Sequence, residues 1–249
     1  MVHFVGAGSG AADLITIRGK KLIEEADVII YAGSLVNPEL LKYASTDCII
    51  YNSAEMNLDE IINVIAAAER DTKTTVRLHT GDPSIYGAIR EQMNRLDELG
   101  IAYDICPGVS SMCGAAAVLK AEYTVPDVSQ SVIITRMAGR TPVPAGEDIE
   151  ALAAHGATMV IFLSAGMTKE LSERLIKGGY GPDTSAAIIY KATWPDELVL
   201  RCTVGTLYET ASKHGIIKTA LITVGDFLGE GGVTSRLYDA SFETEFRKP

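Results

Sequence analysis

One strand–turn–helix stretch, residues 74–87 (TTVRLHTGDPSIYG), constrains the fold of this chain most. Val76 and Leu78, which follow two threonines, predict a short buried strand. The cluster Thr80-Gly81-Asp82-Pro83 ends that strand, and residues 85–99 then predict a helix. In open α/β sheets, ligands bind at the carboxyl ends of the strands. The turn is therefore a candidate binding site, and an ordinary turn capped by Asp82 is the alternative.

The same alternation of apolar runs and helical patterns continues along the chain. Predicted strands are 2–5, 28–31, 48–51, 74–78, 103–106, 131–135, 159–163, 186–190, 198–203 and 221–224. Predicted helices are 16–26, 58–70, 85–99, 110–119, 149–155, 169–177 and 206–214. This pattern predicts two α/β domains with mixed, mostly parallel sheets. We place the domains at 1–120 and 130–228, with a linker at 121–129 and a tail of unclear structure at 229–249.

The composition narrows the range of partners. The chain has 249 residues, of which 47% are hydrophobic and 22% charged, and its net charge is −10. An acidic protein is a poor ligand for nucleic acid or for an anionic membrane surface. The sequence has no apolar run long enough to span a bilayer, so we expect a cytoplasmic protein. Its cysteines and histidines lack the spacing of metal ligands, and we expect no metal site.

A glycine loop, GAGSGA at residues 6–11, fits the dinucleotide-binding fingerprint. That fingerprint requires an acidic residue at the end of the second strand to hold the ribose hydroxyls. Here the second strand ends in Tyr31-Ala32-Gly33, so the dinucleotide interpretation is weak. Further candidate turns are 107–111 and the stiff, basic loop 136–144 (RMAGRTPVP), which suits carboxylate recognition.

Taken together, five motifs resemble the tetrapyrrole methylase family. In chain order they are GAGSGAADLITIRG, RLHTGDPSIYG, CPGVSS, RTPVP and YKATWPDE. The resemblance covers residues 2–225. It departs from the family at Ser9, Ala11 and Ala12, where the family usually reads GAGPGDP. Three longer runs, HTGDPSIYGAI, TRMAGRTPVP and YKATWPDE, most resemble members that methylate precorrin-4 or cobalt-precorrin-4 at carbon 11 in cobalamin (vitamin B12) biosynthesis.

The resemblance implies a ligand cleft between the two α/β domains, with S-adenosylmethionine folded inside it. The cofactor contacts that it implies are Thr80, Gly81, Asp82, Ser110, Ser111, Leu163, Ser164, Tyr190, Lys191, Thr219, Ala220 and Ile222. It also implies that the glycine loop faces the substrate, through Gly8 and Ser9, and binds no dinucleotide.

The chemistry implied by the resemblance needs little from acids or bases. The sulfonium methyl group is already activated, so positioning of two large ligands and exclusion of water should supply most of the rate. Asp82 and Tyr86 are predicted catalytic residues in this positioning sense. The substrate carries acetate and propionate groups, for which Arg90, Arg136, Arg140 and Lys191 are the candidate partners.

Three other functions stay open from the sequence. The first is a sister methylase that acts at another carbon of the corrin precursor. The second is a nucleotide-dependent oxidoreductase that uses the glycine loop. The third is a tetrapyrrole carrier without catalysis. The expected partners are a tetrapyrrole substrate and a second copy of the chain in a homodimer.

Overall fold

A computed structural model describes residues 1–229, 241–243 and 245–248. The chain divides into two units: Met1–Ala115 with Lys191–Glu197, and Ala116–Tyr190 with Leu198 onwards. The predicted domain limits differ from this division at residues 116–120 and at the loop Lys191–Glu197. The prediction for the tail 229–249 lies mostly outside the described residues.

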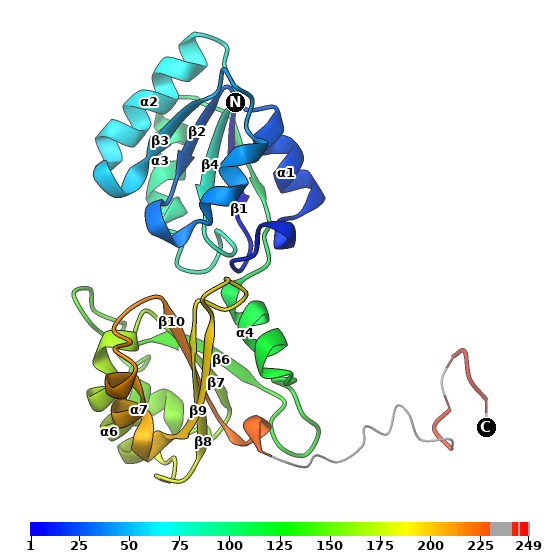
Figure 1. Cartoon of the computed structure of the whole chain (residues 1–249), viewed down its shortest axis with the longest axis vertical. Helices are drawn as coiled ribbons and strands as arrows, with labels where there is room; N and C mark the ends of the chain where they lie inside the picture. Colours follow the sequence, from blue (N-terminus) through cyan, green and yellow to red (C-terminus); the bar gives the residue numbers. More distant parts are fainter. Residues whose placement is uncertain (230–240, 244, 249) are drawn as a thin grey trace. The chain divides into compact units, whose positions relative to one another are not determined.

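The first unit is a parallel sheet with helices on both faces (Figure 1). Its strand order is β3-β2-β4-β1-β5. The strands are β1 Val2–Gly6, β2 Val28–Tyr31, β3 Ile49–Asn52, β4 Thr75–His79 and β5 Tyr103–Cys106. The helices are α1 Ile17–Glu24, α2 Leu58–Arg70, α3 Ile89–Glu98 and the start of α4 Ser111–Leu119. Short 3₁₀ segments are η1 Ala12–Leu14, η2 Gly33–Leu35, η3 Pro38–Tyr43 and η4 Ser53–Glu55.

Two apolar clusters bury both faces of this sheet. Phe4 and Ile30 pack with residues of α2 and α3, whereas Val5 and Ile29 pack with residues of α1 and η3. A strand that is buried on both faces is mostly hydrophobic, because successive side chains point to opposite faces. The buried sheet therefore holds the ends of its strands in fixed positions, and the loops that follow these ends are the part of the unit available to form a site.

The second unit has a mixed sheet of order β6-β7-β10-β8-β9. Its strands are β6 Val132–Arg136, β7 Thr158–Phe162, β8 Ser185–Tyr190, β9 Leu198–Thr203 and β10 Ala220–Val224. Its helices are α5 Ile149–Ala153, α6 Thr168–Gly178 and α7 Leu207–Lys213, with 3₁₀ segments η5 Ala165–Met167, η6 Val204–Thr206 and η7 Asp226–Leu228. The pair β6–β7 is parallel, and the other three pairs are antiparallel, including the predicted hairpin β8–β9.

The predicted fold class is confirmed. All four pairings of the first sheet are parallel, as is one of the four in the second, so five of eight are parallel overall. The predicted capping box of α2 is also present: Asn57 accepts from the Glu60 amide, and the Glu60 carboxylate accepts from the Asn57 amide.

The clearest error of the sequence prediction is the start of the helix after the central turn. We predicted helix from residue 85, but α3 begins at Ile89. Residues 83–86 form turns, and Tyr86 and Ala88 have left-handed backbone conformations with φ of 54° and 50°. Such conformations interrupt a helix, and apolar spacing alone does not reveal them.

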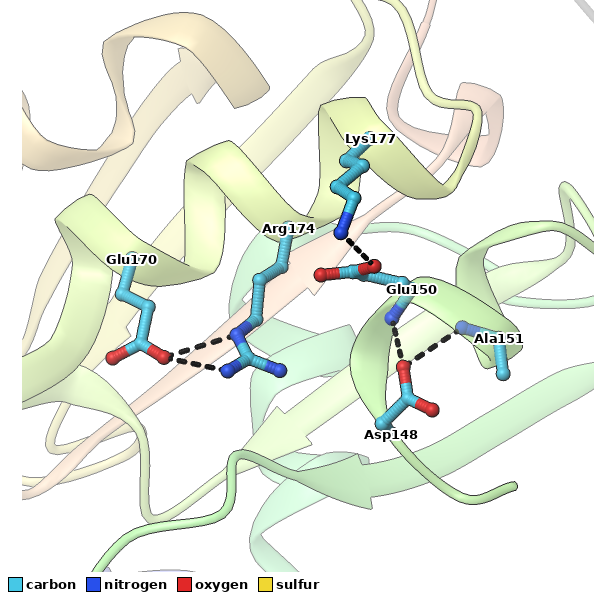
Figure 2. Close-up of polar contacts among 6 residues, drawn as sticks. All are labelled: Asp148, Glu150, Ala151, Glu170, Arg174 and Lys177. Carbon is cyan, nitrogen blue, oxygen red and sulfur yellow. Dashed lines mark hydrogen bonds and ion pairs between the residues drawn. The ribbon is translucent and has the colours of Figure 1, made fainter. Parts of the chain in front are cut away.

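Helices α5 and α6 pack closely in the second unit. Asp148 caps α5 by accepting from the amides of Glu150 and Ala151, at 3.0 and 3.1 Å. Figure 2 shows this cap beside the ion pair of Lys177 with Glu150 at 2.7 Å. Gly178, the last residue of α6, has no room for a side chain, since a Cβ there would lie 2.5 Å from the Glu150 carbonyl oxygen.

Candidate functional site

Three loops meet at the carboxyl ends of β1, β4 and β5 in the first unit. Gly8 and Gly81 exchange backbone hydrogen bonds at 3.2 and 2.9 Å. Gly6 lies against the third loop, because a Cβ there would be 2.5 Å from the Gly108 Cα. A Cβ on Gly81 would lie 3.3 Å from the Ser111 amide nitrogen. The structure thus brings together the predicted residues of the glycine loop, the 80–82 turn and the 110–111 turn.

Asp82 holds two of these loops together. Its carboxylate accepts from the Gly108 amide at 2.8 Å and from the Ser84 amide at 2.9 Å, and also from the Ser84 hydroxyl. Partial burial raises the pKa of the Asp82 carboxyl, but the hydrogen bonds from Ser84 and Gly108 outweigh burial, and the pKa lies below its ordinary value. The side chain is therefore an anion that shapes the loops, which agrees with a positioning role and not with proton transfer.

The glycine loop is covered by the protein's own chain. Trp194 lies directly against Gly10, whose carbonyl accepts from the Asn37 side-chain amide at 2.8 Å. Thr193 accepts from the Ala11 amide at 3.0 Å and bonds the Ser9 hydroxyl at 3.2 Å. A dinucleotide fingerprint needs open glycines and a helix that begins at the loop. Here α1 begins only at Ile17, so the geometry does not favour a dinucleotide site.

In the second unit, five predicted cofactor residues lie at or next to the ends of three inner strands, on the same side of the sheet's length. The end of β7, the start of β10 and the end of β8 are neighbours there, because β10 runs antiparallel to both. The five residues are Leu163, Ser164, Tyr190, Thr219 and Ala220. Ser164 is fully buried, and its hydroxyl accepts from the Met137 amide and donates to the Phe162 carbonyl. Its side chain therefore shapes the end of β7.

Ile222 lies elsewhere. It sits in the middle of β10, paired on one side with Ile161 and on the other with Ile188, and its side chain is 0% exposed within the core. Ile222 is therefore a core residue and does not lie at a strand end, so we leave it out of the proposed cofactor contacts.

Strained backbone coincides with the predicted site. Nine described residues other than glycine have positive φ, and four of them are predicted site residues: Tyr86, Leu163, Lys191 and Thr219. Such conformations cost of order 1 to 3 kcal/mol each and gather at functional sites. Leu163 combines a φ of 52° with a side chain that is 66% exposed at the end of a buried strand. An exposed apolar surface on a fixed backbone suits contact with a flat ligand.

The predicted substrate-binding cations differ in their exposure and in their contacts within the protein. Arg136 donates to the carbonyls of Met137, Thr141 and Pro142, so its guanidinium organises its own loop. Arg140, in that loop, is exposed. Lys191 forms an ion pair with Asp196 at 2.6 Å.

Arg90 is also exposed, on the first turn of α3. The exposed guanidinium groups of Arg90 and Arg140 are the ones best placed to meet a dissolved anion.

Two buried polar residues escaped the sequence analysis. Arg77 and His79 lie in β4, 5% and 4% exposed, on the sheet face covered by α2 and α3. The prediction of their strand rests on the apolar residues Val76 and Leu78 and assigns no role to Arg77 or His79. The signal that could have found them is an arginine and a histidine at alternate positions of a predicted buried strand, since arginine is almost never fully buried unless it is paired.

The fold and these strand-end loops are those of a methyltransferase class. The family profile of the tetrapyrrole (corrin/porphyrin) methylases matches residues 1–208. The chain belongs to this family, which confirms the resemblance carried by its motifs.

Individual relatives match nearly the whole chain. A cobalt-precorrin-4 C(11)-methyltransferase of Methanocaldococcus jannaschii is 54% identical over 99% of this chain and 96% of its own length. A precorrin-4 C(11)-methyltransferase of Mycobacterium tuberculosis is 43% identical over 96% of both chains. The crystal structure of a cobalt precorrin-4 methyltransferase, a cobalamin biosynthetic enzyme, superposes with a TM-score of 0.89 at 44% identity, covering 91% of this chain and 95% of the other.

Proposed function

We propose that this protein transfers a methyl group from S-adenosylmethionine to carbon 11 of precorrin-4 or cobalt-precorrin-4 in cobalamin biosynthesis. The observation that carries the proposal is the 54% identity, over nearly the full length, to a relative named for this reaction. Related enzymes are named for both the cobalt and the metal-free substrate, so the proposal includes both forms.

The residues present fit the cofactor. S-adenosylmethionine, when bound, supplies a methyl group on a positively charged sulfur. In the first unit, Thr80–Asp82 and Ser110–Ser111 offer polar groups and backbone amides at strand ends, where Gly81 allows close approach. In the second unit, Leu163, Tyr190 and Thr219 offer strand-end backbone and apolar surface. Lys191 completes the proposed set.

The substrate contacts follow from the charges. Arg90 and Arg140 have exposed guanidinium groups that can bind acetate or propionate side chains. Arg136 supports Arg140 by organising the loop, and Gly8 and Ser9 remain proposed contacts of the glycine loop. Asp82 and Tyr86 are proposed to position the reacting groups, because no proton need be moved before the methyl group is transferred.

A sister methylase acting at another ring carbon is the nearest alternative, since fold and cofactor would be the same. The deciding experiment is incubation with methyl-labelled S-adenosylmethionine and cobalt-precorrin-4, followed by NMR location of the label. Label at carbon 11 is expected, and label at another carbon indicates the sister activity. Binding of both ligands without transfer indicates a carrier.

Thermal unfolding tests the oxidoreductase alternative. A ligand at a hundred times its dissociation constant stabilises the folded protein by about 2.7 kcal/mol. We expect S-adenosylhomocysteine, and not NAD, to raise the unfolding temperature. Stabilisation by NAD alone would refute the cofactor proposal.

We also propose that the protein is a cytoplasmic homodimer, since the family that it resembles forms dimers. Among the described residues, no helix combines the length and apolar character needed to cross a bilayer. Light scattering at micromolar concentration should give twice the chain mass of 26.6 kDa. A monomer mass would contradict the dimer without affecting the proposed reaction.

A further inference from the structure

A pocket of about 300 Å³ opens in the first unit beside the carboxyl end of β4. Its walls are apolar on the side of η4 and α2, where Met56, Leu58 and Ile61 line it. Its polar lining includes Arg77 and His79 from β4 and Gln92 from α3. All three of these polar side chains are at least 95% buried. None has a role in the reaction described above.

Arg77 is a buried cation without a balancing anion. Its Nε donates to the Gln92 side-chain oxygen and its Nη1 to the Ile30 carbonyl, both at 3.0 Å, and both acceptors are neutral. Among the described residues it forms no ion pair with a carboxylate. Burial lowers the pKa of Arg77 to about 10, so it stays charged at neutral pH. An uncompensated buried charge is costly, and an anion in the pocket would relieve that cost.

His79 supplies a second unused polar group in the same place. Its ring Nε2 is buried and has no hydrogen-bond partner in the part of the chain that the structure describes. The ring lies near Phe4, with centroids 6.0 Å apart. Arg77 and His79 are two residues apart on one strand, so their side chains leave the sheet on the same face. An unpartnered ring nitrogen donates a hydrogen bond when it carries the proton of the neutral imidazole. Beside an unbalanced cation, it suits an anion with two oxygens.

From these contacts we infer that the pocket binds a carboxylate, with the Arg77 guanidinium as the charged donor and the His79 imidazole as a second donor. The inference rests on the proposed function for its source: the carboxylate belongs to an acetate or propionate side chain of the tetrapyrrole. The apolar wall of Met56, Leu58 and Ile61 suits the methylene groups of such a side chain. Glu91 also lines the pocket and is exposed. Its negative charge repels a bound carboxylate, but solvent reduces this repulsion because the side chain is exposed.

The cleanest variant is His79→Leu. The leucine keeps the site filled, and no described hydrogen bond of the ring is lost. Arg77→Gln removes the charge but also disturbs the contacts with Gln92 and Ile30, so it is a second variant and not the first. Arg95→Gln is the matched control, since Arg95 is a half-buried arginine of the same helix α3 that pairs instead with Asp59 and Glu98.

Two probes separate the carboxylate from its source. Sodium propionate tests the pocket itself, and uroporphyrin III, a stable tetrapyrrole with acetate and propionate side chains, tests the larger ligand. NMR of the imidazole groups reports His79 among the four histidines of the chain. We expect both probes to shift the His79 resonances of the wild-type protein, and uroporphyrin III to compete with propionate.

Affinities then decide the roles. Loss of a neutral hydrogen bond should weaken uroporphyrin III binding roughly three- to tenfold in His79→Leu, and loss of a charged one roughly ten- to a hundredfold in Arg77→Gln. Arg95→Gln should bind as the wild type does, and all three variants should keep their affinity for S-adenosylhomocysteine.

Unchanged uroporphyrin III affinity in both pocket variants would overturn the inference. Propionate binding without competition from uroporphyrin III would overturn the assignment to the substrate. Neither result depends on methyl transfer, so failure of the proposed function would be seen separately, as wild-type protein that does not methylate.

Discussion

At the scale of single residues, the buried position of His79 disfavours protonation of its imidazole. Burial and, secondarily, the charge of Arg77 lower the pKa of its imidazole to about 3. In the unfolded chain a histidine takes up its proton near pH 6.5. Between those values the unfolded state binds more protons than the folded state, so the free energy of unfolding falls as the pH is lowered from about 6.5 towards 3.

We therefore expect His79→Leu to lose this part of the pH dependence. One titrating group contributes at most about 1.4 kcal/mol per pH unit. Urea unfolding of the wild-type protein and the variant at several pH values between 7 and 4 measures it. The stability of the wild-type protein should fall more steeply with acid than that of the variant. Parallel curves would show that His79 is protonated in the folded protein as readily as in the unfolded one.

The residues that sequence analysis found and those that it missed differ in a physical way. Gly81 and Asp82 stood out because glycine and aspartate interrupt regular structure, and a turn can be predicted from them locally. Arg77 and His79 did not, because their meaning depends on burial between a sheet and two helices, which no local pattern records. The occupied guanidinium of Arg136 likewise depends on the course of its own loop.

Among the elements, the contact between α5 and α6 gives a direct test of packing. A Cβ at Gly178 would lie 2.5 Å from the Glu150 carbonyl oxygen and 2.6 Å from the Ala153 Cβ. Backbone cannot yield as a flexible side chain can, so Gly178→Ala should destabilise the protein by about 1 to 3 kcal/mol. The measurement is the urea midpoint of unfolding at neutral pH.

The neighbouring Lys177→Ala is the control for that prediction. It removes the ion pair with Glu150 seen in Figure 2 but adds no atoms to the helix contact. Lys177 is largely exposed, and exposed ion pairs contribute about 0 to 1 kcal/mol. If the two variants lost equal stability, close packing at Gly178 would not be the cause.

Whole elements were more predictable than their ends. The strands β2 and β5 and the helix α2 have the predicted bounds. In α2 the start is marked locally, by the capping box of Asn57 and Glu60. The largest shift is in α3, which begins four residues later than predicted because Tyr86 and Ala88 have left-handed backbone conformations. The two left-handed residues lie beside the pocket and the proposed cofactor residues Thr80–Asp82. The departure from local rules therefore falls in the proposed functional region.

For the molecule as a whole, the charge distribution constrains how an anionic substrate can bind. The net charge of −10 repels a polycarboxylate on average. Binding therefore depends on local cations with exposed side chains, such as Arg90 and Arg140. The sequence alone indicates Arg140 as one of these cations, because it lies in a stiff, basic loop. The division of the chain into units could not be predicted in the same way. The loop Lys191–Glu197 joins the first unit through contacts between residues far apart in the sequence.

Asp82→Ala and Arg140→Ala, one in each unit, should fail in different ways. Asp82 fastens the 80–82 turn to the loop after β5. Its loss should weaken binding of S-adenosylhomocysteine by about tenfold or more, as expected when a charged hydrogen bond of 1.5 to 3 kcal/mol no longer shapes the site. Turnover should fall too, because the methyl group would be misplaced.

Arg140→Ala should instead raise the apparent substrate constant roughly ten- to a hundredfold and leave cofactor affinity nearly unchanged. Arg140→Lys, which keeps the charge but not the planar fork, should lie between the wild-type protein and Arg140→Ala. Calorimetry gives the cofactor affinity, and methyl transfer at varied substrate concentration gives the substrate constant. Loss of cofactor binding in Arg140→Ala with normal binding in Asp82→Ala would reverse the assignment of the two residues.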